Sequence, residues 1–241
     1  MGSEMCIRDR GTLVSLSFSD LHQYELCPVR YRYRSVWQVP APPDELLPRA
    51  LQAMGSTELG RSVHEALAAW HLGQGPDLAA LYSGPEGGRA LLEHYAAHPL
   101  SRASTLGAEV EFNLRLSGAR VRGLVDLVCT LDGRLTLVDF KTNARLDAAL
   151  LAAYSTQLRL YGLAAREGLL PGGPVADPRL LLFDLRRGEA IEVAPDPDGV
   201  RRLAEEIAGK IAAGNFELGP EHAGRPCRLC AYRPVCPSAR E

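Results

Sequence analysis

The chain has 241 residues, of which 46% are hydrophobic, and a formal net charge of −2. This length suffices for a hydrophobic core in one domain, or in one domain with an appendage, and no apolar run approaches the roughly 18 residues of a membrane span. The near-neutral charge excludes a protein that binds polyanions through its net charge, so any nucleic-acid binding has to come from local patches.

The first residues, MGSEMCIRDRG, match no predicted element. They lack the apolar stretch of a secretory signal, which predicts that the protein stays in the cytoplasm. We therefore expect residues 1–14 to be disordered or extraneous, and residues 15–241 to form a single domain.

Two helical patterns precede residue 80. The stretch SFSDLHQYELCP predicts a short helix with Ser19 as its N-cap, and Pro28 prevents the helix from continuing. After a proline-rich connector, ELGRSVHEALAAWHLG (residues 58–73) carries an apolar stripe at helical spacing and ends near Gly73.

The remaining pattern mixes helices and strands, which indicates an α/β or α+β protein. Apolar residues at a period of two predict strands at about 109–116, 120–131 and 134–141. RLLLFDLRR and EAIEVA predict a second hairpin. Further helices are expected at about 87–97, 146–167 and 198–213.

Two aspartates are predicted to face each other across the first hairpin, within VRGLVDLVCTLDGRLTLVDFKTN (residues 121–143). Its Asp132-Gly133 pair is a strong two-residue turn signal between apolar runs. This turn places Asp126 opposite Asp139, with Cβ atoms about 5 Å apart. Lys141 lies two residues after Asp139 and projects from the same side of the sheet.

Opposed carboxylates in a half-buried hairpin repel each other and are costly to desolvate. One alternative is structural: one aspartate caps a turn and the other pairs with Lys141. A divalent cation that bridges the pair would instead remove the repulsion, and it prefers hard oxygen ligands. Lys141 and Lys210 are the two lysines among 27 basic residues. A lysine can orient a metal-bound water, or deprotonate it as the neutral amine, and its compact ammonium can neutralise charge on phosphate, which favours metal-assisted phosphodiester hydrolysis.

At these residues the sequence resembles the PD-(D/E)XK nuclease superfamily, in which GLVD is followed by DFK. GRSVH, AEVEF and QLRLY resemble, in order, the Gly-x-x-x-His motif, the opening strand and the Gln-x-x-x-Tyr motif of the RecB-type exonuclease branch. The matches run from about residue 15 to 238. The resemblance implies an α/β fold with a mixed central sheet flanked by helices, as in restriction endonucleases.

The resemblance also implies roles for single residues. It implies that His64, Asp126 and Asp139 bind Mg²⁺ or Mn²⁺. The catalytic residues that it implies are Lys141, Asp126, Asp139, Gln157 and Tyr161, the last two supporting the lysine or contacting the DNA strand. From the residues alone, a lone histidine on an amphipathic helix is more often structural than a ligand. His71 is as eligible by position, and Gln157 and Tyr161 could simply pack together.

Four cysteines are candidates for a second metal site. Cys227, Cys230 and Cys236 have the spacing C-x2-C-x5-C, and Cys27 lies near the other end of the chain. Disulfides are not expected in the cytoplasm, and four thiolates suit either structural zinc or an iron–sulfur cluster. One cysteine before the nuclease core and three after it resembles the 4Fe–4S staple of AddB-type and CRISPR adaptation nucleases. This resemblance implies a cluster region formed by residues 15–37 and 219–238.

Arginine-rich segments lie beside these cysteines. RYRYR offers charge for phosphates and rings for base stacking, so Arg30, Tyr31, Arg32 and Tyr33 are predicted to bind DNA. The alternative is a solvated arginine face. Cys129, within a strand, is expected to be buried core.

We therefore predict a metal-dependent DNA exonuclease that acts on single-stranded ends in repair or recombination. A CRISPR adaptation nuclease that trims spacer precursors and a non-catalytic DNA-binding subunit of a helicase–nuclease complex are alternatives. A third is a zinc-stapled metallohydrolase with some non-nucleic substrate. The sequence has no G-x-x-x-x-G-K-[ST] loop, so a separate helicase, or a CRISPR integrase, is the expected partner.

Overall fold

The computed structural model describes residues 13–40, 58–219, 222 and 227–239. The chain divides into two compact units. The first comprises Met1–Gln52, Arg115–Arg122 and Arg201–Glu241, and the second comprises Ala53–Leu114 and Gly123–Val200. Both chain ends that the sequence assigned to the cysteine region belong to the first unit. Among the described helices, none combines the length and apolarity needed to cross a membrane.

A mixed β-sheet forms the centre of the second unit, as predicted. Its strands are β2 (Ser104–Leu116), β3 (Ala119–Leu131), β4 (Arg134–Lys141), β5 (Arg179–Asp184) and β6 (Glu189–Val193), with the end of β2 and the start of β3 belonging to the first unit. β3 pairs with β4 antiparallel, β4 with β5 parallel, and β5 with β6 antiparallel, while β2 pairs with β3. β2 starts at Ser104, before the predicted start at about residue 109, because the prediction followed an apolar alternation that the first residues of the strand lack.

The hairpin between β3 and β4 has the predicted turn. Asp132 and Gly133 have φ angles of 53° and 77°, and positive values at both central residues are characteristic of a type I′ turn. The register runs from the pair Leu131–Arg134 to the pair Leu127–Val138. If this register is continued by one more pair, Asp126 lies opposite Asp139.

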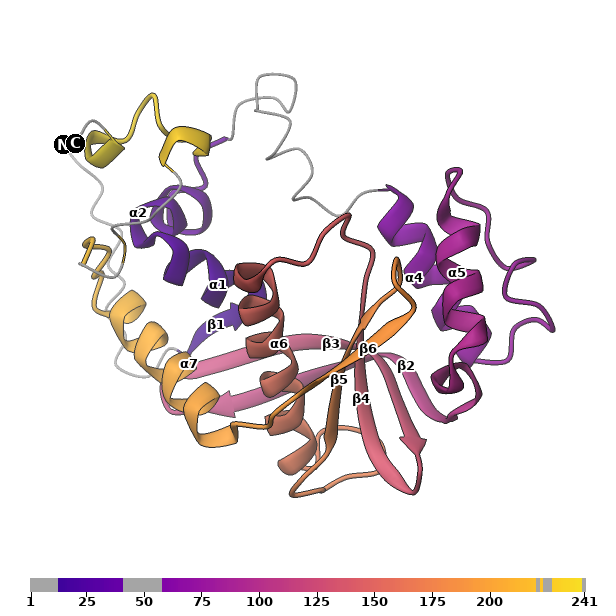
Figure 1. Cartoon of the computed structure of the whole chain (residues 1–241). Helices are drawn as coiled ribbons and strands as arrows, with labels where there is room; N and C mark the ends of the chain where they lie inside the picture. Colours follow the sequence, from indigo (N-terminus) through magenta and orange to yellow (C-terminus); the bar gives the residue numbers. More distant parts are fainter. Residues whose placement is uncertain (1–12, 41–57, 220–221, 223–226, 240–241) are drawn as a thin grey trace. The chain divides into compact units, whose positions relative to one another are not determined.

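Helices cover both faces of this sheet (Figure 1). The helices of the second unit are α4 (Glu58–His71), α5 (Gly88–Ala97), η3 (Pro99–Arg102) and α6 (Ala148–Arg166). Apolar residues of α4 and α5 form one buried cluster with Val138 and Phe140 of β4. Successive residues of a strand point to opposite faces, so Asp139 and Lys141 face α6. Asp139 and Lys141 therefore point toward α6, whereas His64 is carried by α4.

His71 of α4 packs against the rest of the second unit and does not line the cavity that contains Asp126 and Lys141. Its ring nitrogens contact the hydroxyls of Thr105 and Tyr95. Burial lowers the pKa of His71 to about 4. The position of His71 on α4 made it as eligible as His64, and only the tertiary structure separates the two.

This burial predicts a pH effect on stability. Between pH 6.5 and 4 the unfolded chain takes up a proton at His71 that the folded chain does not, so stability falls as pH falls, by about 2 kcal/mol at pH 5. Chemical denaturation of the wild type and of His71→Gln at pH 7 and pH 5 measures this. The variant should lose less stability over that interval, and equal losses would contradict the assignment.

The first unit contains the chain ends. Its strand β1 (Val14–Ser17) pairs parallel with the first residues of β3. Its helices are α1 (Phe18–Leu26), α2 (Pro28–Tyr31), the π-helical turn η1 (Arg32–Val36), α7 (Pro197–Ala212, whose first residues belong to the second unit), η5 (Cys227–Leu229) and η6 (Pro237–Ala239). The predicted N-cap Ser19 is wrong. Ser17 caps α1, because it forms a reciprocal capping box with Asp20, three residues on.

Candidate active site

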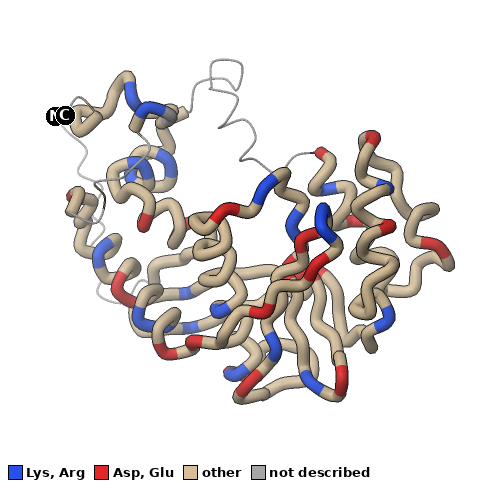
Figure 2. Tube along the Cα trace, viewed as in Figure 1, with Lys and Arg blue, Asp and Glu red and all other residues tan. Residues whose placement is uncertain are grey.

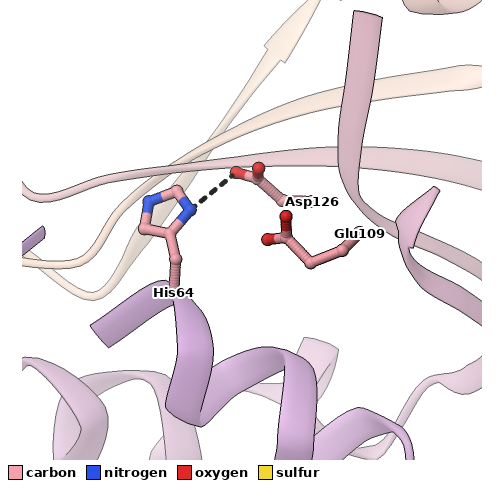
Figure 3. A group of neighbouring side chains, drawn as sticks. All are labelled: His64, Glu109 and Asp126. Carbon is pink, nitrogen blue, oxygen red and sulfur yellow. Dashed lines mark ion pairs between the residues drawn. The ribbon is translucent and has the colours of Figure 1, made fainter. Parts of the chain in front are cut away.

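His64 points from α4 toward the start of the central hairpin. Its Nδ1 lies 3.5 Å from Oδ2 of Asp126 (Figure 3). Burial by itself would lower the pKa of His64, but the carboxylates of Asp126 and Asp139 outweigh it and raise this pKa. The imidazole is therefore held next to negative charge, as a ligand of a shared cation would be.

Asp126 lies where the β3–β4 ladder ends. Its Oδ2 accepts a hydrogen bond of 2.7 Å from the backbone N–H of Phe140, one residue beyond Asp139. Burial would raise the pKa of Asp126, but His64, Lys141 and this N–H outweigh it and lower the pKa. Asp126 is thus a buried anion that the backbone N–H of Phe140 holds at the end of the β3–β4 pairing.

Glu109 of β2 completes a cluster that the sequence analysis did not assign. His64, Glu109 and Asp126 each present a ligand atom, and these atoms lie within 4.8 Å of one another (Figure 3). Burial and the charge of Asp126 raise the pKa of Glu109. Its φ of 51° is unusual for a residue with a side chain and costs of order 1 kcal/mol, a strain that tends to occur at functional sites. An acid within the AEVEF strand motif was the signal available.

Lys141 is held by a ring of contacts from β4 and α6. Its Nζ lies 2.6 Å from Oδ2 of Asp139 and donates to Oε1 of Gln157 at 3.2 Å. Gln157 donates to the hydroxyl of Tyr161 at 2.6 Å, and that hydroxyl donates to Oδ1 of Asp139 at 3.3 Å. The ammonium also lies 4.2 Å from the ring centroid of Tyr154. Gln157 and Tyr161 thus share one face of α6 and position the acid–lysine pair.

The ion pair between Asp139 and Lys141 corresponds to the structural alternative of the sequence analysis. The buried Oδ2 atom of Asp139 lies 2.6 Å from Nζ of Lys141, and among the described residues it has no hydrogen-bond partner besides this ammonium. Burial and the charge of Asp126 raise the pKa of Asp139 to about 6, against the opposing effect of Lys141. Because a carboxylate oxygen has more than one lone pair, Oδ2 can still bind a cation beside Lys141.

These residues border an open cavity of about 930 Å³ in the second unit. Its lining includes His64, Glu109, Asp126 and Lys141, together with Arg61 and Arg186. The volume is in the range of sites that bind small ligands. The arrangement combines a cluster of hard ligands with one fixed ammonium.

The family model of the PD-(D/E)XK nuclease superfamily matches residues 15–237. The chain belongs to this superfamily. It is 28% identical over 141 residues to the gene 69 protein of Mycobacterium phage L5, a match that covers 54% of this chain and 43% of the phage protein. The chain thus spans less than half the length of that curated relative.

Two solved structures are similar to this PD-(D/E)XK chain. The "Putative exonuclease" of Eubacterium rectale has 12% identity and a TM-score of 0.51, with 94% of this chain and 87% of the other covered. SSO0001 has 19% identity and a TM-score of 0.47, with 96% and 88% covered. At such identities the likeness to the Eubacterium rectale structure concerns the fold.

PD-(D/E)XK nucleases use divalent metals, and the residues present suit one. His64, Glu109 and Asp126 offer nitrogen and carboxylate ligands at mutual distances that one cation can bridge. Oδ2 of Asp139, which pairs with the ammonium of Lys141, is a further candidate ligand. The structure groups two of the three ligands implied by the resemblance with Glu109, while Asp139 pairs with Lys141.

Metal binding by this cluster can be tested directly. Asp126→Asn and Glu109→Gln should each weaken Mn²⁺ binding by about tenfold or more, because each removes one anionic ligand. Isothermal titration calorimetry measures the affinity. Glu111→Gln, an exposed acid two residues along the same strand, is the matched control and should bind Mn²⁺ like the wild type. Equal affinities in all four proteins would count against the cluster.

The first unit of this PD-(D/E)XK chain has a second feature, here called the cysteine cavity. Cys27, Cys227, Cys230 and Cys236 all line it. The N–H of Arg30 donates to Sγ of Cys27 at 3.4 Å. Four thiols from both ends of the chain therefore converge, although Cys27 lies about two hundred residues before the other three in sequence. Cys129 is fully buried in the core of the second unit, as predicted.

The four residues predicted to bind DNA differ in exposure. Tyr31 is buried at 5% exposure and packs against Tyr24 and Phe216, so its ring is a packing element. Arg32 is exposed, and Arg30 and Tyr33 are partly exposed beside the cysteine cavity.

Proposed function

We propose that this chain is a metal-dependent DNA exonuclease of the RecB type, which hydrolyses phosphodiester bonds at single-stranded ends in repair or recombination. The observation that carries the proposal is the closed Lys141–Asp139–Tyr161–Gln157 network beside the His64–Glu109–Asp126 cluster. The histidine and glutamine–tyrosine motifs, distant in sequence, meet the acid–lysine pair in one unit. That convergence supports the RecB-type assignment.

A divalent cation held by His64, Glu109 and Asp126, with Asp139 as a further donor, would polarise the phosphate and acidify water. Burial by itself would lower the pKa of Lys141, but Asp139 and Asp126 outweigh it and raise this pKa. Lys141 is therefore a fixed ammonium at neutral pH. Its role is to hold the attacking water and to neutralise negative charge that develops on the phosphate, rather than to remove a proton.

Gln157 and Tyr161 restrict where that ammonium can go. Gln157 accepts from Lys141 and donates to Tyr161, so its amide orientation is fixed from both sides. Tyr161 in turn donates to Asp139, and burial raises its pKa well above the usual value, so its hydroxyl stays protonated. A non-catalytic subunit would have no need of such a preorganised lysine.

We further propose that the cysteine cavity holds a 4Fe–4S cluster. Two observations support this proposal: Cys27, Cys227, Cys230 and Cys236 line one cavity, and their order along the chain resembles the 4Fe–4S staple of AddB-type and CRISPR adaptation nucleases. Four thiolates would also suit zinc. Iron and zinc analysis of the purified protein, together with its visible absorbance, distinguishes the two.

The nuclease proposal is tested by Mn²⁺-dependent digestion of single strands labelled at the 5′ or the 3′ end. Stepwise shortening of one of the two, abolished by EDTA, is the expected result. A blunt duplex of the same sequence should be degraded more slowly without a helicase. If no strand is cut at any Mn²⁺ or Mg²⁺ concentration, the proposal fails.

A further inference from the structure

Trp37 is an exposed aromatic residue in the first unit. Half of its surface is accessible. The guanidinium of Arg32 lies over its ring, with Cζ 3.9 Å from the centroid, and Tyr33 meets it edge-on at 5.2 Å between centroids. An accessible tryptophan held between a cation and another ring is a preformed surface.

The π-helical turn creates this arrangement. In an α-helix, residues five apart do not share a face. Here the N–H of Trp37 donates to the carbonyl of Arg32 at 2.8 Å, the five-residue bond of a π turn, which brings the two residues into line. Such turns are rare and occur frequently at functional sites.

The C-terminal segment supports the same surface. The rings of Tyr33 and Tyr232 stack, with an interplanar angle of 17° and centroids 5.5 Å apart. Tyr33 donates to the carbonyl of Val235 at 3.1 Å, and Tyr232 donates to that of Val39 at 3.2 Å. Residues 27–40 and 227–239 are therefore joined at this point within the first unit.

Charge indicates what this surface binds. The two segments contain no aspartate or glutamate, so their trace in Figure 2 is blue and tan. Their five arginines are Arg30, Arg32, Arg34, Arg228 and Arg233. Arginines bind phosphates through paired N–H donors, and an accessible indole stacks on a nucleobase. A duplex offers no unstacked internal base, whereas a single strand offers one at every nucleotide.

We propose that Trp37, backed by Arg32, is a stacking site for a nucleobase of single-stranded DNA, and that the surrounding arginines bind the adjacent phosphates. The choice of DNA rests on the proposed nuclease function; the stacking site itself does not. Trp37 was not among the residues that the sequence predicted to bind DNA. The site would hold the strand at the cysteine region of the first unit, through residues other than those proposed to act on the phosphodiester.

The affinity of a labelled oligothymidylate, measured by fluorescence anisotropy in EDTA so that no strand is cut, tests the site. Trp37→Ala should weaken binding about tenfold, and Trp37→Phe should restore most of the affinity because it retains a ring. Arg32→Ala should also weaken binding, more so at low salt. Leu169→Ala and Arg166→Ala change exposed residues of the second unit and are the controls.

A spectroscopic readout is available because the chain has two tryptophans. In Trp70→Phe, Trp37 is the only tryptophan, and oligothymidylate should quench its fluorescence. Wild-type affinity in Trp37→Ala, or no quenching, would overturn the proposal. Tighter binding of oligouridylate would overturn the choice of DNA.

Kinetics separate this site from the proposed chemistry. Trp37→Ala should raise the KM for an oligonucleotide and leave hydrolysis of a p-nitrophenyl ester of thymidine monophosphate unchanged, because that small diester has a single nucleoside and no further base for a separate stacking site. If no variant or wild type cuts either substrate but Trp37→Ala still weakens binding, the nuclease proposal fails and the stacking site stands.

Discussion

Lys141→Ala is expected to lower the rate of single-strand cleavage by about 10³-fold, the scale seen when a preorganised group that stabilises transition-state charge is removed. The reason is the position of the ammonium: it is fixed by Asp139 at 2.6 Å and by Gln157 at 3.2 Å beside the His64–Glu109–Asp126 cluster. Mn²⁺-dependent digestion of an end-labelled strand under single-turnover conditions measures the rate.

Two further variants make the result specific. Lys141→Arg keeps a positive charge but replaces a compact ammonium with a planar fork that does not fit between Asp139 and Gln157, so it should also be inactive. Lys210→Ala changes the other lysine, which pairs on the surface of α7 with Glu206 at 2.7 Å, and should cleave like the wild type. Full activity in Lys141→Ala would end the assignment.

Loss of folding has to be excluded as the cause. Removing Lys141 leaves the buried carboxylate of Asp139 without its cation. The pKa of Asp139 is already raised to about 6 by burial and by Asp126, so the group can take up a proton instead of remaining charged. The variant should therefore melt cooperatively below the wild type, with unchanged circular dichroism, and Lys141→Ala with Asp139→Asn should recover part of the lost stability.

The part of this site that the sequence predicted depends on local geometry. The Asp132-Gly133 turn fixed the register of two strands, and the strand period then fixed which side Asp139 and Lys141 share. Glu109 was missed because it comes from β2, and no turn signal specifies how its side chain meets Asp126. His64 and His71 are alike on their helix, and only packing against Tyr95 and Thr105 separates them.

The elements of the fold that the sequence did not predict are short or depend on a single backbone bond. The long helices and the hairpins follow from periodicity over many residues. β1 has four residues, too few for a period, and is held by pairing with β3. The π-helical turn at Arg32–Val36 depends on a hydrogen bond from the N–H of Trp37 to the carbonyl of Arg32, and no sequence pattern predicts such a bond. The surface proposed to bind DNA was therefore predicted in composition but not in geometry.

Cys27→Ser should give a protein that has lost the visible absorbance of an iron–sulfur cluster and melts about 10–20 °C below the wild type. Cys27 is the N-terminal member of the cysteine cavity, and the other three cysteines lie near the C-terminus. A cluster that joins them closes a loop of nearly the whole chain, and losing such a link costs about 5 kcal/mol.

Cys129→Ala is the matched control, because Cys129 is fully buried in the core of the second unit and lies outside the cysteine cavity. It should keep the colour and the iron content while losing some stability through the cavity it leaves. An unchanged spectrum in Cys27→Ser would exclude Cys27 as a ligand. A colourless wild type that contains zinc would replace the iron–sulfur cluster with a zinc site on the same cysteines. Since the arginines and aromatics of both chain ends are joined beside this cavity, loss of the cluster should also weaken oligothymidylate binding, whereas Cys129→Ala should not.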